Sequence, residues 1–371
     1  MGMSSRPDPL GENLARLRTG RQLTQEQLAE TSGVSVDTIS RLERGQRSIA
    51  RPATLGRLAA ALHVDLLTLL GVQPTEQVSA GADHLRRAIR ALDLPEFADN
   101  TDVLPLPDLQ AATGVAWRDY IAGQHSALLA TLPSLMVDTR RAVHASTGDA
   151  AARAAELLCT SYRLAAGLAG RIGLTDLAMH AAHRALDIAR STTRPELDQA
   201  ASIRYLVWVL IRQGEHADAQ RLAVRAAERL DPGPMAGADA DKLTVIGNLL
   251  FNAASAAARD GHAERADDLL TVARAAAIRS NAGHVSELGI FGPRVAAIQH
   301  VDQTVRVGDS DRALELAGQM PDGSVPAFWE AGHRLHLAAA AADLREYGKP
   351  CHTWPRRATS PPTGYDSGPS A

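Results

Sequence analysis

Glycine recurs at intervals of 40 to 50 residues, and the residues on either side of each glycine have the periodicity of an amphipathic helix. The glycines at the centres of these turns are Gly123, Gly173, Gly214, Gly261, Gly308 and Gly348. Because glycine readily adopts the left-handed backbone conformation that ends a helix, each position is suited to a turn between two helices. The spacing therefore predicts a series of helical hairpins over residues 108–348.

The composition of these hairpins indicates how they pack. Only 4% of the chain is aromatic, and alanine is frequent in predicted helices such as Ala178–Ala189 and Ala263–Ala276. Alanine has the highest helix propensity. Each predicted hairpin is apolar on more than one face, so its neighbours have to cover it, which predicts a stacked α-solenoid. The hairpins resemble tetratricopeptide repeats, although that family's usual spacing is about 34 residues and its bulky signature residues are mostly missing. A helical bundle is the alternative.

The other segments divide the chain into further parts. Residues 1–75 predict a compact helical domain. Residues 76–107 are interrupted by prolines and predict a linker with one helix, His84–Leu92. Residues 349–371 are rich in Pro, Ser, Thr and Gly without periodicity and predict an irregular, disordered tail. That tail leaves the last hairpin without its second helix, and a shifted reading frame is an alternative explanation. The whole chain is predicted to be all-α.

Residues 24–45 carry the pattern of two short helices joined by a tight turn. Thr24 and Gln27 are spaced for a capping box, Gly33 permits a sharp turn, and Ser35 is suited to cap a second helix that ends at Gly45. The residues expected on the inner faces are Ala29, Val34, Ile39 and Leu42. This combination is typical of a helix-turn-helix motif.

The same segment resembles the family of phage Cro and repressor proteins, also called the XRE family, over about Leu10–Gly71. The matching stretches are Leu23-Thr24-Gln25, Leu28-Ala29, Ser32-Gly33-Val34-Ser35, Ile39–Gly45 and Leu55–Leu62. The resemblance implies a five-helix domain whose second motif helix enters the major groove of an operator in double-stranded DNA. It also implies a homodimer, because such proteins commonly contact two half-sites about one helical turn apart.

By this resemblance, the outward residues of the second motif helix read the edges of the bases. They are Ser35, Val36, Asp37, Ser40 and Arg41. Arg41 is suited to a bidentate contact with guanine, Asp37 to accept a hydrogen bond from cytosine, and Val36 to contact a thymine methyl group.

Other polar residues are expected to hold the DNA backbone or the fold. The expected phosphate contacts, which position a protein without reading sequence, are Gln25, Arg44, Arg47 and Arg51. Arg18 and Glu43 match positions at which the family has a structural ion pair, and a DNA contact by Arg18 is the alternative.

Candidate ligand-binding residues of the repeat region lie on helices that precede glycine turns. Asn248 and Asn252 are four residues apart and share one helix face, and an asparagine amide can both donate to and accept from a peptide backbone. Helical-repeat regulators that sense peptides resemble this arrangement, and the alternative is that both amides bond to neighbouring helices. Further candidates are Arg204, Trp329 and His333, whereas Tyr205 and Trp208 are expected in the core.

The sequence offers no positive sign of an enzyme or a metal site. The histidine pairs His180/His183 and His333/His336 have a spacing that can place two ligands on one helix face, but no third ligand accompanies either pair. There is no P-loop, dinucleotide fingerprint or nucleophile elbow. We therefore expect neither a cofactor nor a metal, and no catalytic residues.

Charge and cysteine content restrict the class of protein further. The net charge is −3, but residues 1–71 carry nine arginines against seven acidic residues, so the acidic balance lies in the rest of the chain. Two distant cysteines, no signal core and no membrane-spanning run predict a cytoplasmic protein. Arginine makes up all but two of the 39 basic residues, which indicates GC-rich codons and an actinobacterial source.

These features together predict a sequence-specific transcriptional regulator. The helical repeat region would dimerise, sense a peptide or small-molecule signal, or both. The alternative is a scaffold or adaptor protein whose helix-turn-helix region contacts other proteins.

Overall fold

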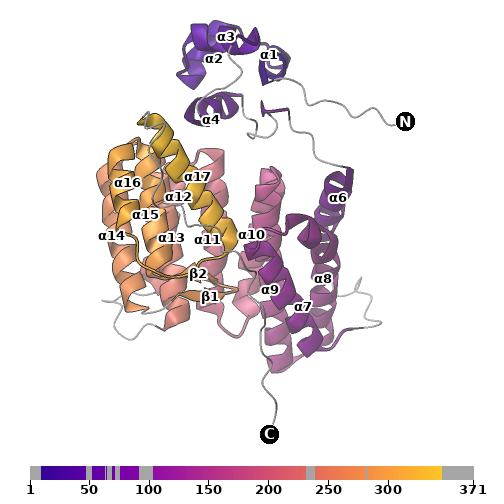
Figure 1. The fold of residues 1–371 in the computed structure, drawn as a ribbon. Helices are drawn as coiled ribbons and strands as arrows, with labels where there is room; N and C mark the ends of the chain where they lie inside the picture. Colours follow the sequence, from indigo (N-terminus) through magenta and orange to yellow (C-terminus); the bar gives the residue numbers. More distant parts are fainter. Residues whose placement is uncertain are drawn as a thin grey trace, which may run out of the picture.

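A computed structural model describes residues 10–46, 52–62, 64, 69–71, 76–91, 103–230, 239–280 and 283–344. The described residues form helices and one two-stranded sheet (Figure 1), so the predicted all-α class is confirmed. We call residues 10–71 the head and the helical region from residue 76 onward the body. No helix among the described residues combines the length and apolar character that crossing a bilayer requires.

The head contains four helices among its described residues. They are α1 (Leu10–Gly20), α2 (Gln25–Ser32), α3 (Val36–Glu43) and α4 (Pro52–Ala61). The predicted capping box is present, since Thr24 Oγ1 accepts from the backbone of Gln27 and the Gln27 side chain accepts from the backbone of Thr24. Gly33 has φ of 63° and ends α2, which aims the chain into α3.

A small apolar core holds the head together. Its fully buried members include Leu14, Leu28, Ile39, Leu58 and Leu62, contributed by α1 to α4 and the residue that follows α4. Helix α1 lies so close to α3 that a Cβ atom at Gly11 would meet the carbonyl oxygen of Leu42. The two motif helices are therefore fixed on a packed base, and the far face of α3 is left open.

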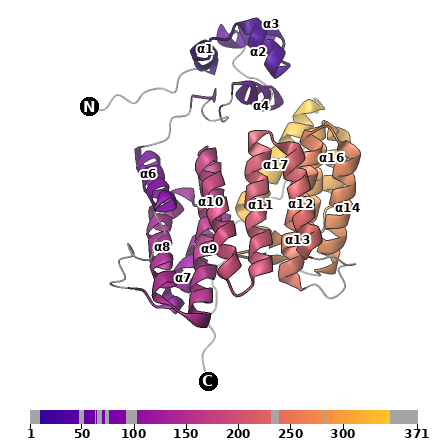
Figure 2. The same cartoon turned by 180° about the vertical axis from the view of Figure 1, so that it is seen from behind.

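The body is a row of antiparallel helical hairpins, which Figures 1 and 2 show side by side in chain order. The hairpins are α7 (Leu106–Ile121) with α8 (His125–Ala145), α9 (Gly148–Arg171) with α10 (Thr175–Ile188), α11 (Pro195–Gln213) with α12 (His216–Leu230), α13 (Ala240–Arg259) with α14 (Ala263–Arg279), and α15 (Pro293–Val307) with α16 (Ser310–Gly318). A short 3-10 helix, η2 (Ala189–Ser191), follows α10.

The predicted glycine turns join these pairs. Gly123, Gly173, Gly214, Gly261 and Gly308 all have φ between 76° and 90°, the left-handed conformation that glycine favours. The sixth predicted turn, at Gly348, and the predicted tail lie outside the described residues. Two clusters of buried residues form the core, and α11 contributes to both, so the repeats share one continuous interior.

Helix α6 (Glu76–Arg90) lies within the segment predicted as a linker. It packs on α8 and buries Leu85 and Ile89 in the core of the body. Arg140 Nη2 on α8 also donates to the carbonyl of Ala88 at 2.9 Å. The segment 76–107 therefore contributes a helix to the repeat region, starting earlier than the predicted His84.

Two elements cross the concave side of the hairpin row. The antiparallel strands β1 (His284–Ser286) and β2 (Gly289–Phe291) lie against α13, where a Cβ atom on Gly247 would meet the ring of Phe291. Helix α17 (Ala327–Asp343) begins next to the first hairpin, since its Phe328 packs on Gly123 and on the ring of His125. The concave side is thereby partly closed.

Candidate functional site

The outer surface of α3 is the first candidate site. Val36 is 37% exposed, and Asp37 and Arg41 are exposed and form an ion pair of 3.0 Å between Arg41 Nε and Asp37 Oδ1. Ser35 is also exposed, and its hydroxyl oxygen caps α3 by accepting from the backbone of Thr38.

Ser40 differs from the outward position predicted for it. It is only 8% exposed, so its side chain is largely buried. Arg44 is exposed just beyond the end of α3, whereas Arg47 and Arg51 lie outside the described residues.

A partly buried junction behind α3 joins three helices. The predicted ion pair between Arg18 and Glu43 is present as two parallel hydrogen bonds, Nε to Oε1 at 2.7 Å and Nη2 to Oε2 at 2.9 Å. Gln25 Nε2 donates to the same carboxylate at 2.6 Å, so the side chain predicted to hold a phosphate is part of this junction. The bond to Glu43 raises the pKa of Arg18. These residues fix α3 against α1 and α2.

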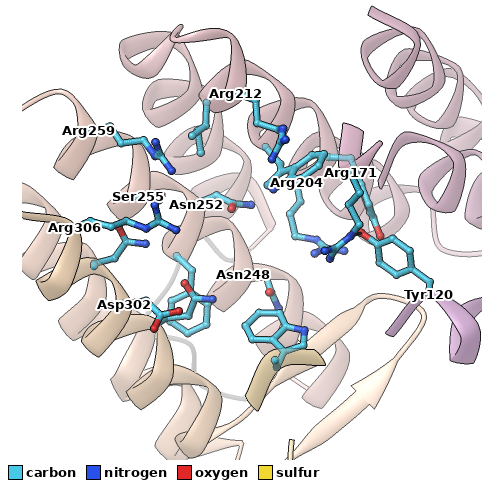
Figure 3. Close-up of a pocket in the computed structure, with 17 residues that line it drawn as sticks. Tyr120, Arg171, Arg204, Arg212, Asn248, Asn252, Ser255, Arg259, Asp302 and Arg306 are labelled. Carbon is cyan, nitrogen blue, oxygen red and sulfur yellow. Dashed lines mark hydrogen bonds between the residues drawn. The ribbon is translucent and has the colours of Figure 1, made fainter. Parts of the chain in front are cut away.

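The second candidate site is a cavity of about 290 Å³ on the concave side of the body (Figure 3). It is lined by residues of α7, α9, α11, α13, α15 and the first turn of α17. Four of the predicted ligand-binding residues line it: Arg204, Asn248, Asn252 and Trp329. Tyr205 and Trp208 line it as well. Tyr205 is buried in the core as expected, and Trp208 is partly buried and packs against that core.

Two of the predicted residues, Asn248 and His333, make contacts that hold the walls of the cavity together. Asn248 Nδ2 donates to the carbonyls of Thr244 at 2.8 Å and Ile290 at 3.2 Å, so this amide fastens the β-hairpin to α13. His333 does not line the cavity. It is buried, and its Nδ1 lies 3.4 Å from Oδ1 of Asp302, which does line the cavity.

Arginine dominates the charge of the cavity. Five guanidinium groups line it, against one carboxylate, Asp302; the arginines are Arg171, Arg204, Arg212, Arg259 and Arg306. Partial desolvation lowers the pKa of Arg259 to about 10, and the positive charges of Arg306 and Arg212 act in the same direction. The arginines are therefore close enough to repel one another.

Four of these arginines, which were not among the predicted ligand-binding residues, share a recognisable position in the sequence. Each lies two residues before a turn glycine, at the last turn of the first helix of a hairpin; the pairs are Arg171/Gly173, Arg212/Gly214, Arg259/Gly261 and Arg306/Gly308. Because equivalent positions of stacked repeats lie side by side, this recurrence places the four side chains along one edge.

The histidine pairs do not extend into a metal site among the described residues, where no group of three or more His, Cys, Asp or Glu side chains is arranged to hold an ion. His333 and His336 instead flank Asp302, with His336 Nδ1 2.8 Å from its Oδ1. Burial alone would raise the pKa of Asp302, but these two neighbours outweigh that effect and lower it.

The sequence of the head is similar to a known family of DNA-binding domains and to named regulators. Residues 9–76 match the family described as a helix-turn-helix domain. The HTH-type transcriptional regulator y4dJ of Sinorhizobium fredii, described as uncharacterized, is 43% identical over 75 residues, which cover 19% of this chain and 90% of that protein. The chain therefore belongs to the helix-turn-helix transcriptional regulators.

Two proteins of Bacillus subtilis are similar over the same region. The uncharacterized HTH-type transcriptional regulator RghRB is 42% identical over 78 residues, 21% of this chain and 50% of the relative. The HTH-type transcriptional repressor RghR is 49% identical over 57 residues, 15% of this chain and 42% of the relative. The chain thus spans about half the length of these two relatives, and the similarity concerns the head.

Solved structures match along most of the chain at low similarity. Bacillus thuringiensis PlcR, solved in complex with the peptide PapR7 and DNA, is 12% identical with a TM-score of 0.38, covering 92% of this chain and all of that chain. The apo form of ComR from S. thermophilus is 13% identical with a TM-score of 0.31, covering 90% and 99%.

Proposed function

We propose that this protein is a homodimeric transcriptional regulator that binds a specific operator through α3 and adjusts that binding when a peptide or small signal occupies the body cavity. The observation that carries the first part is the open face of α3, where Val36, Asp37 and Arg41 are exposed on a helix held rigidly from behind. The three relatives described above that match the head are named as transcriptional regulators or as a transcriptional repressor.

In the proposed complex, α3 enters the major groove. Arg41 exchanges its partner Asp37 for a guanine at small cost, because an exposed ion pair of this kind stabilises a protein by less than about 1 kcal/mol. Asp37 is then free to accept from a cytosine, and Val36 lies beside a thymine methyl group. Ser35 is a further candidate, while Ser40 is too buried to contribute.

Phosphate contacts fix the register of such a complex without reading sequence. Arg44 is suited to this role because it is exposed next to α3. Arg47 and Arg51 remain predictions from the sequence, and Gln25 would have to leave Glu43 to reach a phosphate with its side chain.

The body is proposed to be the sensor. Its cavity lies between repeats that are far apart in the sequence, so its lining comes from α7, α9, α11, α13, α15 and α17 together. Asn252 points toward the interior of this cavity (Figure 3), and Arg204 and Trp329 lie on its wall. A ligand that favours one arrangement of these repeats would change operator affinity, typically by 1–3 kcal/mol.

A salt titration of binding to a selected operator tests the first part of the proposal. DNA retained from a random pool is used in fluorescence anisotropy with the full chain at about 50 to 200 mM salt. A regulator binds the selected sequence far more tightly than a scrambled one, and its affinity falls steeply with salt. An adaptor protein would show no sequence preference, and that result would remove the proposal.

A further inference from the structure

We propose that the body cavity takes an anionic ligand with at least two carboxylate or phosphate groups, held by the row of arginines at the ends of α11, α13 and α15. The inference rests on the proposed sensing function and specifies the chemistry of its signal. Guanidinium groups bind carboxylates and phosphates through paired, charge-assisted hydrogen bonds, which are stronger than bonds between neutral groups.

The row is built by the repeat. Arg212, Arg259 and Arg306 occupy the same place in three successive hairpins, and all three are exposed side chains at the edge of the cavity. Figure 3 shows them on neighbouring helices around the same opening. Three cations in a row present a binding surface for a ligand with several negative charges.

The charge of the row is not balanced by the cavity's own carboxylate. Asp302 is flanked by His333 and His336, whose nitrogens lie 3.4 and 2.8 Å from its Oδ1. Burial lowers the pKa of Arg259, and the positive charges of Arg306 and Arg212 lower it further. An anion would relieve this repulsion on binding.

Arg204, on the inner wall of the cavity, gives independent support for an anionic ligand. Its Nε and Nη2 atoms are buried and have no hydrogen-bond partner among the described residues, and its guanidinium lies 4.5 Å from the centre of the Tyr205 ring. Buried polar atoms in native proteins are nearly always bonded, so two unpartnered donors in a cavity wall point to an acceptor supplied from outside the chain.

A favourable interaction with the negative end of each helix dipole is the alternative reason for arginine at these positions. That interaction acts on each helix separately, so it does not require the guanidinium groups to share one cavity. It also gives no reason for Arg204, which lies near the middle of α11.

Calorimetry on the full chain, without DNA, tests this proposal. The probes are short peptides with two glutamates and a free carboxyl terminus, the same peptides with glutamine and an amidated terminus, inorganic pyrophosphate and nucleoside diphosphates. We expect at least one anionic set to bind, and the peptide and phosphate probes distinguish the two sources of negative charge. We expect the neutral peptides to bind at least about tenfold more weakly than their acidic counterparts, or not at all.

The decisive variant is Arg259→Gln combined with Arg306→Gln. It should weaken the anionic probe by about 100-fold, since each charged hydrogen-bonding contact contributes about tenfold or more. The matched control, Arg225→Gln with Arg265→Gln, removes the same charge from exposed positions on α12 and α14 and should leave binding unchanged. Circular dichroism melting verifies that both variants fold.

The proposal is overturned if no anionic probe binds, if the neutral peptides bind equally well, or if the cavity variant keeps full affinity. A different result would contradict the proposed sensing function. That result is an anionic probe that binds to the wild-type chain and not to the cavity variant, while operator affinity is the same with and without the probe.

Discussion

In the head, Arg41 and Arg44 lie exposed on the outer surface around α3, whereas in the body the arginines of the hairpin ends line one cavity. An outward arrangement suits a charged partner larger than the domain, such as a DNA duplex. An inward arrangement suits a charged partner small enough to enter the cavity. Arginine thus indicates two different classes of partner. Which class it indicates depends on whether the fold places the side chain on the outer surface or in the cavity.

The two regions also differ in how they use buried charge. In the body, Arg163 on α9 and Asp198 on α11 are completely buried and joined by a bond of 2.8 Å. In the head, the Arg18–Glu43 pair is partly exposed, with 17% and 7% of the side chains accessible. The first pair joins two hairpins of the repeat, and the second positions α3. Removing either pair should therefore affect only its own region.

The largest expected effect is that of Asp198→Ala on the stability of the body. Removing the carboxylate leaves the Arg163 guanidinium buried without its ionic partner, which typically costs about 3–5 kcal/mol. Denaturant unfolding of the full chain measures the loss, and hydrogen exchange separates head from body. Asp187→Ala, at an exposed position on α10, is the control. Equal loss in both variants, or lost protection in the head, would contradict the proposed division.

Glu43→Ala is expected to have a somewhat smaller effect, confined to the head. It removes the acceptor of Arg18 and Gln25 at a partly exposed site, so we expect a loss of about 2 kcal/mol. Hydrogen exchange in the full chain should show faster opening of α1 to α3 with the body unchanged. Glu30→Ala, at an exposed position of α2, serves as the comparison. Unaltered protection in the head would mean that the junction does not stabilise α3.

Arg41→Ala and Arg44→Ala should separate reading from positioning within the head. Losing Arg41 should relax preference at one base pair by about 1–3 kcal/mol. Losing Arg44 should weaken all sequences alike and reduce the salt slope by about 1. Anisotropy with the selected operator and its single-base variants measures both. A uniform loss for Arg41→Ala would show that the register assigned to α3 is wrong.

Local sequence patterns predicted the features of this fold that depend on neighbouring residues. The turn glycines and the capping box at Thr24 are examples, because turns and caps involve residues that are close in the sequence. The ion pair of Arg18 and Glu43, which are 25 residues apart, was expected from the family resemblance instead. The strands β1 and β2 have three residues each, too few to show an alternating pattern. Their place is fixed by distant contacts, such as that between Gly247 and Phe291.

The cavity was only partly predictable for the same reason. Asn252, Arg204 and Trp329 were candidates because of their type and helix position, and all three line it. Phe328 contacts Gly123 and Arg171, which are more than 150 residues away in the sequence. Such a contact depends on how the whole row of hairpins packs, and no local sequence pattern predicts it. The row of arginines was readable, since each precedes a turn glycine by two residues, but only when the repeats are aligned on those glycines.

The smallest expected effect concerns the contact between the first turn of α17 and the first hairpin. His125 packs edge-on against Phe328, with ring centres 5.8 Å apart, and burial together with the charge of Arg171 lowers its pKa. A group whose pKa is lower in the folded state takes up a proton more readily when the contact opens. Its stabilising contribution is therefore present above the unfolded pKa of about 6.5 and is lost as the pH falls through the lower folded value.

Protection factors for the first turn of α17, corrected for intrinsic exchange, should thus decrease between about pH 7.5 and 5.5, the range in which histidine changes charge. His125→Phe keeps an aromatic ring against Phe328 but cannot be protonated, so in that variant the decrease should disappear. The positive charge of Arg171 would repel a protonated His125. Protonation of His125 should therefore favour release of Phe328 from the first hairpin. The same decrease in both proteins would show that a group other than His125 controls the opening of this contact.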